Sequence, residues 1–144
     1  MRSNKRMLEM LQSIEEPPLD PRLGDLLAAG FVEHTGGTFL GSYKSRLDAA
    51  SRDDFEDMTG FECFINHVHV DDYVTASGRS LVAQGMRFAK TLADKLRGLG
   101  RYTVIISSDG DTCSVRFHRS RAGESWLADD LETYRDEGVA AIQP

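Results

Sequence analysis

Residues 80–99 read SLVAQGMRFAKTLADKLRGL, and their spacing predicts the helix around which the rest of the chain is organised. Apolar residues recur at steps of three and four, which places them on one face of an α-helix and the charged residues on the other. Ser80 is the expected N-cap, and Gly98 can end the helix in a left-handed conformation. Such a helix needs a sheet to pack against. The apolar stripe comprises Leu81, Gly85, Phe88, Ala89, Leu92, Ala93, Leu96 and Leu99.

The flanking sequence predicts that sheet. Residues 61–70 (FECFINHVHV) are rich in β-branched and aromatic side chains, which favours a strand. Residues 101–107 (RYTVIIS) and 112–118 (TCSVRFH) are two further strand-like runs, and the Asp-Gly pair at positions 109 and 110 between them is a strong hairpin signal. Residues 139–142 predict a short last strand.

A second amphipathic helix is expected over residues 125–135, with Leu127, Leu131 and Tyr134 facing inward. From residue 61 onward the expected order of elements is therefore β-α-β-β-α-β. This order predicts a ferredoxin-like core, an α+β fold in which an antiparallel sheet carries helices on one face. The residues expected to be buried are Leu81, Ala89, Leu92, Leu96, Ile105, Val115, Phe117, Leu127 and Leu131.

The first 60 residues predict a helical N-terminal extension that covers the sheet or its edge. Residues 7–14 form an amphipathic run, and a second helix is expected after Asp20, a good N-cap, with Pro21 at the first helical position. Gly36 and Gly37 indicate a turn beside a short strand. The chain is thus expected to be a single domain, residues 1–144, made of an extension (1–60) and an α+β core (61–144).

The composition restricts the classes of function. The net charge is −6, and an acidic surface repels phosphate backbones, so nucleic-acid binding is not expected. No run approaches the ~18 apolar residues that a membrane span requires, and the first residues do not form a secretory signal. Only two cysteines are present, which predicts a reduced, cytoplasmic protein.

A metal site is one candidate chemistry of the predicted strand at residues 61–70. Cys63, His67 and His69 would share one face of that strand, because side chains alternate, and these residue types bind transition metals. A fourth ligand is missing from the local sequence, and Ile65 interrupts the face. No metal and no other cofactor is therefore expected.

Phosphoester chemistry is the second candidate. His118 lies close in sequence to Arg116, Arg119 and Arg121, and a histidine with arginines can act on a phosphate ester. The alternative is a solvated strand end that runs into an arginine-rich loop, and this alternative is favoured. The only tryptophan, Trp126, could anchor an interface, but a core position at the start of the second helix is the expected one.

Two stretches resemble immunity proteins of bacterial contact-dependent growth-inhibition systems. They are residues 117–134 (FHRSRAGESWLADDLETY), which precede the short last strand, and residues 66–73 (NHVHVDDY). The resemblance implies a cytoplasmic protein, not an enzyme, that neutralises a toxin domain, often a nuclease, by binding it directly. Because nuclease surfaces that bind phosphates are basic, an acidic protein suits such a partner.

Acidic side chains are the expected partner-binding residues. They form two clusters, one ahead of residue 61 and one on the predicted second helix: Asp53, Asp54, Glu56 and Asp57, and Asp129, Asp130, Glu132 and Asp136. Two other functions remain open. One is a small phosphoester hydrolase or nuclease that uses His118, and the other is a regulatory or oligomerisation domain. A monomer or a weak homodimer is expected.

Overall fold

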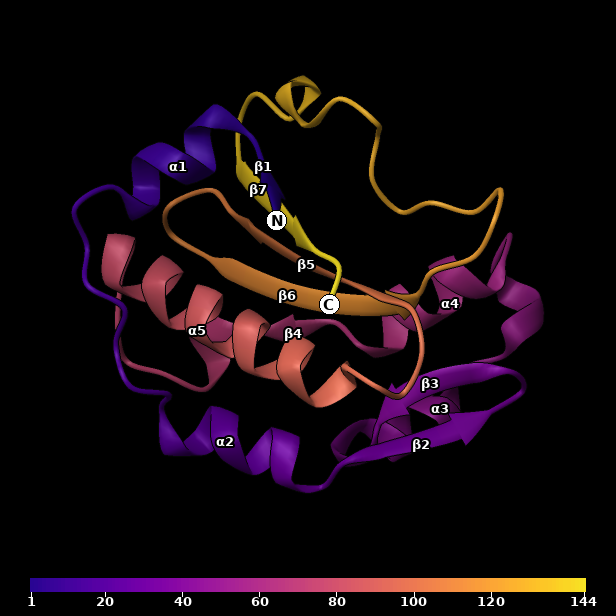
Figure 1. Cartoon of the computed structure of the whole chain (residues 1–144). Helices are drawn as coiled ribbons and strands as arrows, with labels where there is room; N and C mark the ends of the chain where they lie inside the picture. Colours follow the sequence, from indigo (N-terminus) through magenta and orange to yellow (C-terminus); the bar gives the residue numbers. More distant parts are fainter.

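A five-stranded antiparallel sheet forms the centre of the molecule in the computed structural model, which describes residues 1–144 (Figure 1). Every neighbouring pair in the sheet is antiparallel, and the order is β1-β7-β5-β6-β4. An α+β fold with an antiparallel sheet is thus confirmed. The five strands are β1 (Arg2–Ser3), β7 (Gly138–Ile142), β5 (Tyr102–Ser108), β6 (Cys113–Arg119) and β4 (Val68–His69).

The predicted central helix is α5 (Gly78–Leu96), and it packs against one face of the sheet. Its apolar stripe contacts the side chains that β5 and β6 direct to that face, such as Ile106 and Val115. The helix lies so close to β6 that a methyl group on Gly85 would collide with the sulfur of Cys113. The stripe ends at Leu96, because Leu99 lies beyond the helix and is 56% exposed. The N-cap is Ser77, three residues before the predicted cap.

The predicted strand at residues 61–70 is wrong over most of its length. Residues Met58–Ile65 form the helix α4, and only β4 pairs with β6. Asp57 caps this helix, since its Oδ1 accepts a hydrogen bond of 2.7 Å from the Gly60 amide. The aromatic and β-branched composition reflects burial of α4 on several sides, and tertiary packing here overrides strand propensity.

The predicted helix at residues 125–135 is also wrong. The segment is irregular apart from a single 3-10 turn, η4 (Leu131–Thr133). Short polar side chains compete with helical hydrogen bonds: Ser125 Oγ donates to the Leu127 carbonyl, and Asp130 accepts from the Glu132 amide. Every residue expected to be buried is buried except Leu127, in this segment, which is half-buried.

The strand order agrees with the prediction up to this irregular segment and differs from it afterwards. β4, α5 and β5 form a unit with β6 inserted between the two strands, as the prediction requires. However, β7 pairs with β5 rather than with β4, and the connection from β6 to β7 crosses the sheet face opposite α5 without a helix (Figure 1). The ferredoxin-like topology is therefore not confirmed.

The first 60 residues contain strands as well as helices. They comprise α1 (Lys5–Leu11), α2 (Pro21–Ala28), the hairpin of β2 (Phe31–His34) and β3 (Gly37–Leu40), and α3 (Lys44–Ala49). This region also contains two short 3-10 turns, η1 (Gly41–Tyr43) and η2 (Arg52–Asp54), and a third, η3 (Val70–Asp72), follows β4.

These N-terminal elements cover one edge of the sheet and the outer side of α5. β1 pairs with β7, α1 packs against β7, and α2 packs against α5. The start of α2 is as predicted, since the Asp20 carboxylate accepts from the Arg22 amide at 2.9 Å and Pro21 is the first helical residue. None of the helices combines the length and the apolar character that crossing a membrane requires.

Candidate functional site

The sheet face opposite α5 carries polar side chains. Thr103 and Ser107 of β5 and Ser114, Arg116 and His118 of β6 point to this face, because side chains alternate along a strand. We call residues 120–137, which cross this face, the covering segment. Five of its backbone amides bond within it: those of Glu124, Thr133 and Tyr134 to carbonyls, and those of Ala128 and Glu132 to side-chain oxygens. The covering segment is thus held mainly by other parts of the chain.

At its start the covering segment is held by a buried ion pair. Glu62 of α4 is fully buried, and its carboxylate pairs with the guanidinium of Arg121. The same carboxylate accepts hydrogen bonds from the Thr38 amide (2.8 Å) and the Arg119 amide (3.1 Å). Glu62 therefore joins α4, β3, β6 and the covering segment at one point.

Asn4 holds the covering segment at its far end. The Asn4 side chain is buried, and its Nδ2 donates to the carbonyls of Leu131, Tyr134 and Glu137 at 3.4, 3.2 and 2.9 Å. Its Oδ1 accepts from the Val139 amide at 2.9 Å. The Leu131 carbonyl, which would accept from Arg135 in a helix over residues 125–135, is thus bonded to a remote side chain instead.

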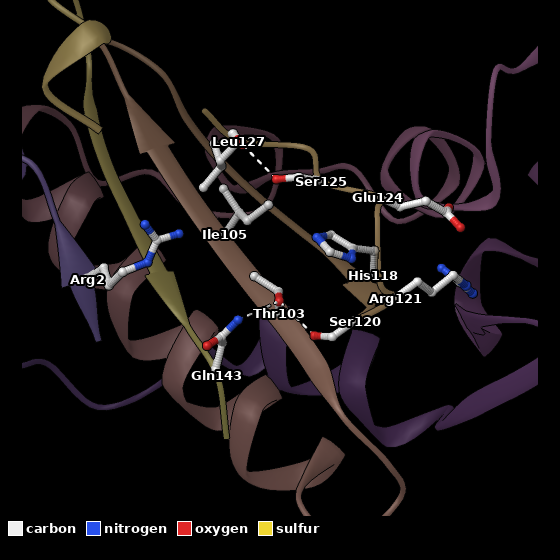
Figure 2. A pocket seen from close by; sticks show the side chains of 10 residues that line it. All are labelled: Arg2, Thr103, Ile105, His118, Ser120, Arg121, Glu124, Ser125, Leu127 and Gln143. Atoms are coloured by element: carbon white, nitrogen blue, oxygen red, sulfur yellow. Dashed lines mark hydrogen bonds between the residues drawn. The ribbon is translucent and has the colours of Figure 1, made fainter. Parts of the chain in front are cut away.

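Between these two ends lies a small polar hollow, drawn in Figure 2. We call it the His118 hollow. Its volume is about 140 Å³, and it is lined by Arg2, Thr103, Ile105, His118, Ser120, Arg121, Glu124, Ser125, Leu127 and Gln143. His118 is only 5% exposed, and its Nδ1 donates to the Arg119 carbonyl at 2.8 Å. Because the carbonyl can only accept, the neutral imidazole presents an unprotonated Nε2.

Next to the hollow lies an aromatic groove, in which Arg116 is the central residue. Its guanidinium lies 4.7 Å from the centre of the Trp126 ring, and its Nη2 lies 3.1 Å from Nε2 of His67. Burial, and secondarily Arg116, lower the pKa of His67 from 6.5 to about 4. His67 is therefore neutral at neutral pH, so that Nε2 can accept a hydrogen bond from Arg116; Ser114 Oγ lies 2.9 Å from the same nitrogen.

The aromatic groove continues onto α4 through the histidines. The rings of His67 and His69 lie 4.1 Å apart, and both line a pocket with Phe64. Phe64 is 56% exposed and lies 5.1 Å from the Phe55 ring. Trp126, at the other end, is 41% exposed, so it does not occupy the expected core position. This pocket and the separate pocket of Arg116 and Trp126 meet at the contact between Arg116 and His67. We call the five residues Phe64, His67, His69, Arg116 and Trp126 together the aromatic groove.

In the sequence, one cluster of the predicted partner-binding acids precedes the groove residues and the other follows them. In the first cluster, next to Phe55, Asp53, Asp54 and Glu56 are exposed, whereas Asp57 is half-buried as the cap of α4. The second cluster follows Trp126 in the covering segment rather than on a helix. Its exposed members are Asp129, Asp130, Glu132 and Asp136.

The residues of the phosphoester candidate come together only in part. Arg121 shares the hollow with His118, but its guanidinium is bound to Glu62. Arg116 lies in the aromatic groove, and Arg119 points to the hairpin, where its Nη2 donates to Glu33 at 3.3 Å. The structure therefore offers His118 no free arginine of this set.

The residues of the metal candidate are also separated. Cys63 is buried in α4, and burial raises its pKa to about 12. His67 and His69 lie together in the aromatic groove. No group of three or more His, Cys, Asp or Glu side chains is placed so that it could hold a metal ion.

Sequence reasoning missed Asn4, Glu62 and Arg2. Asn4 directly precedes α1 and lies shortly before the amphipathic run at residues 7–14, and asparagine is a favoured N-cap, so its capping role had a local signal. The roles of Glu62 and Arg2 depend on contacts with residues more than 55 positions away, for which the sequence offers no local signal.

Comparison with known proteins gives one match. No curated protein and no solved structure is similar enough to match the chain. Residues 2–143 match the family described as the uncharacterized protein PM0498 family. Because the match spans nearly the whole chain, this protein belongs to that family.

Proposed function

We propose that this protein is an immunity-type protein that neutralises a basic toxin domain by binding it through the aromatic groove and its acidic flanks. The observation that carries the proposal is an exposed tryptophan stacked with an arginine, with one acidic cluster next to Phe55 and the other following Trp126 in the covering segment. The resemblance of residues 66–73 and 117–134 to immunity proteins supports it, since both stretches contribute to the groove. The proposed site of action is the cytoplasm, where the protein acts as a monomer.

The centre of the groove has the composition of a binding hot spot. Tryptophan and arginine are enriched among the residues that dominate binding energy at protein interfaces. Trp126 is oriented by Arg116, and Phe64 extends the apolar area on the far side of the histidines. A partner side chain that fills this groove would bury aromatic surface that the free protein leaves exposed.

The acidic clusters supply charge complementarity around that centre. A nuclease or other toxin that binds phosphates has a basic active surface, which a rim of carboxylates attracts. The attraction accelerates association at low ionic strength and is screened at high salt. The proposal therefore predicts an association rate that falls as the salt concentration rises.

The first test measures binding to the protein encoded immediately upstream of this gene. Trp126→Ala and Phe64→Ala are each expected to weaken that binding by about 1–2 kcal/mol, which corresponds to about 5- to 30-fold in Kd. Leu8→Ala and Leu99→Ala are the matched controls, because these two apolar side chains are equally exposed but lie outside the groove. Unchanged binding of both aromatic variants, or no binding by the unmodified protein, would contradict the proposal.

The second test concerns the acidic rim. Reversal of Asp129, Asp130 and Glu132 to lysine, or of Asp53, Asp54 and Glu56, is expected to slow association and to reduce its salt dependence. Reversal of the exposed Glu15, Asp25 and Asp111 changes the net charge equally and serves as the control. If the control slows association as much as both rim variants do, only the net charge matters and the rim is a solvated surface.

A further inference from the structure

The His118 hollow has chemistry that the proposed protein interface does not use. His118 is 95% buried, given its exposure of 5%, yet Nε2 has no hydrogen-bond partner within the chain. Nε2 is not sealed from solvent, so it is available to a molecule that enters the hollow. The imidazole points into the hollow in Figure 2, where this nitrogen is open to a ligand.

The charged side chains of the hollow are not equivalent. The Arg121 guanidinium is bound to Glu62, and the Glu124 carboxylate accepts from the Thr59 amide at 3.1 Å. Figure 2 shows both of these groups directed away from His118, toward α4. Arg2 enters from the opposite side, and only its Nη1 is engaged, by the Asp129 carbonyl at 3.1 Å. The guanidinium of Arg2 therefore has donors left for an anion.

Hydroxyl groups line the floor between Arg2 and His118. Thr103 Oγ1 and Ser120 Oγ lie 2.9 Å apart, and Gln143 Nε2 donates to Thr103 at 3.4 Å. The volume of about 140 Å³ corresponds to roughly four or five water molecules. This is room for one small anion with a few waters.

We infer that the His118 hollow binds a phosphate group, with Arg2 donating to its charged oxygens and His118 accepting from its hydroxyl. A monoprotonated phosphate oxygen supplies the donor that a neutral Nε2 requires, while the other oxygens accept from Arg2 and the hydroxyls. A carboxylate or a sulfate has no proton to give at neutral pH. The inference is independent of the proposed toxin binding, because neither Arg2 nor His118 belongs to the aromatic groove.

The test uses the full chain and follows the His118 ring signals by NMR during titration with inorganic phosphate at constant ionic strength. Phosphate is expected to shift the His118 signals in a saturable manner, and sulfate and acetate are expected to bind more weakly. O-phosphoserine is the second probe: tighter binding than that of inorganic phosphate identifies a phosphomonoester as the ligand class, and weaker binding identifies free phosphate.

Two variants keep the test decisive. Arg2 is exposed, and Arg2→Gln is expected to weaken phosphate binding about tenfold. Arg6→Gln makes the same charge change on α1, outside the hollow, and is expected to leave phosphate binding unchanged. No saturable shift of His118, equal binding of sulfate, or an equal loss in both variants would overturn the inference. His118→Gln, used if its fold is retained, is expected to abolish the preference for phosphate over sulfate.

Discussion

The two faces of the sheet differ in what holds them. On one face α5 covers a continuous apolar layer, and its stripe residues Ala89, Leu92 and Leu96 are fully buried. On the other face the covering segment crosses polar side chains and is held by buried polar contacts at Glu62 and Asn4. The two faces therefore differ in kind: apolar packing holds the α5 face, whereas a few buried polar contacts hold the opposite face and leave side chains there with free bonding capacity.

The largest effect is expected where the covering segment is anchored. Glu62→Ala leaves Arg121 without its buried partner and two amides unbonded, and we expect a loss of about 3–5 kcal/mol in the free energy of unfolding. Chemical denaturation measures it. Glu124→Ala removes a carboxylate that is only half-buried, and a loss of about 1 kcal/mol is expected. Equal losses in the two variants would mean that the ion pair is not a principal anchor.

On the α5 face, Leu92→Ala tests the apolar layer. Leu92 is fully buried, so the lost transfer free energy and the cavity together should cost about 2–5 kcal/mol. Leu99→Ala, at an exposed position beyond the helix, should change the stability little. A loss below about half a kcal/mol for Leu92→Ala would show that the buried face of α5 is misassigned.

Close approach of α5 to the sheet is tested by a pair of glycines. Gly85→Ala forces a methyl group against Cys113, and a loss of about 1–3 kcal/mol is expected from overpacking. Gly24→Ala, in α2, meets only an ordinary contact at 3.9 Å and should stabilise the protein by about 0.5–1 kcal/mol. Stabilisation by both substitutions would mean that α5 lies farther from β6.

The opposite face should respond to pH through His67. Its pKa is about 4 in the folded protein and 6.5 in the unfolded chain, so between these values the unfolded chain binds more protons. The contribution of His67 to stability is complete above about pH 6.5 and is lost as the pH falls toward 4. Denaturation across this range should therefore show a shallower decline for His67→Gln than for the unmodified protein. Parallel curves would contradict the lowered pKa.

The elements with clear local signals could be predicted from the sequence. The stripe of α5, the hairpin of β5 and β6, the strand β7 and the start of α2 at Asp20 are as expected. Each of them has a period or a cap that lies within one short stretch. Their pairing into an antiparallel sheet followed from the hairpin and from the apolar helix face.

The elements that were predicted wrongly depend on distant contacts. Strand propensity misidentified α4, although the cap at Asp57 was a signal for a helix. The helical spacing of Leu127, Leu131 and Tyr134 could not reveal that Asn4 binds two carbonyls of the same stretch. The acidic clusters were visible in the sequence, but the aromatic groove depends on β6 and the covering segment meeting in space.

Hydrogen exchange of the full chain, alone and with the protein encoded upstream, tests most directly whether the face opposite α5 carries the function. In the free protein, amides of the covering segment should exchange far faster than those of β5 and α5, because few are bonded within the segment. Addition of the partner should slow exchange in residues 64–69 and 121–137 and leave α2 unchanged. Slower exchange in α2 or on the outer side of α5, with no change in residues 121–137, would contradict the account.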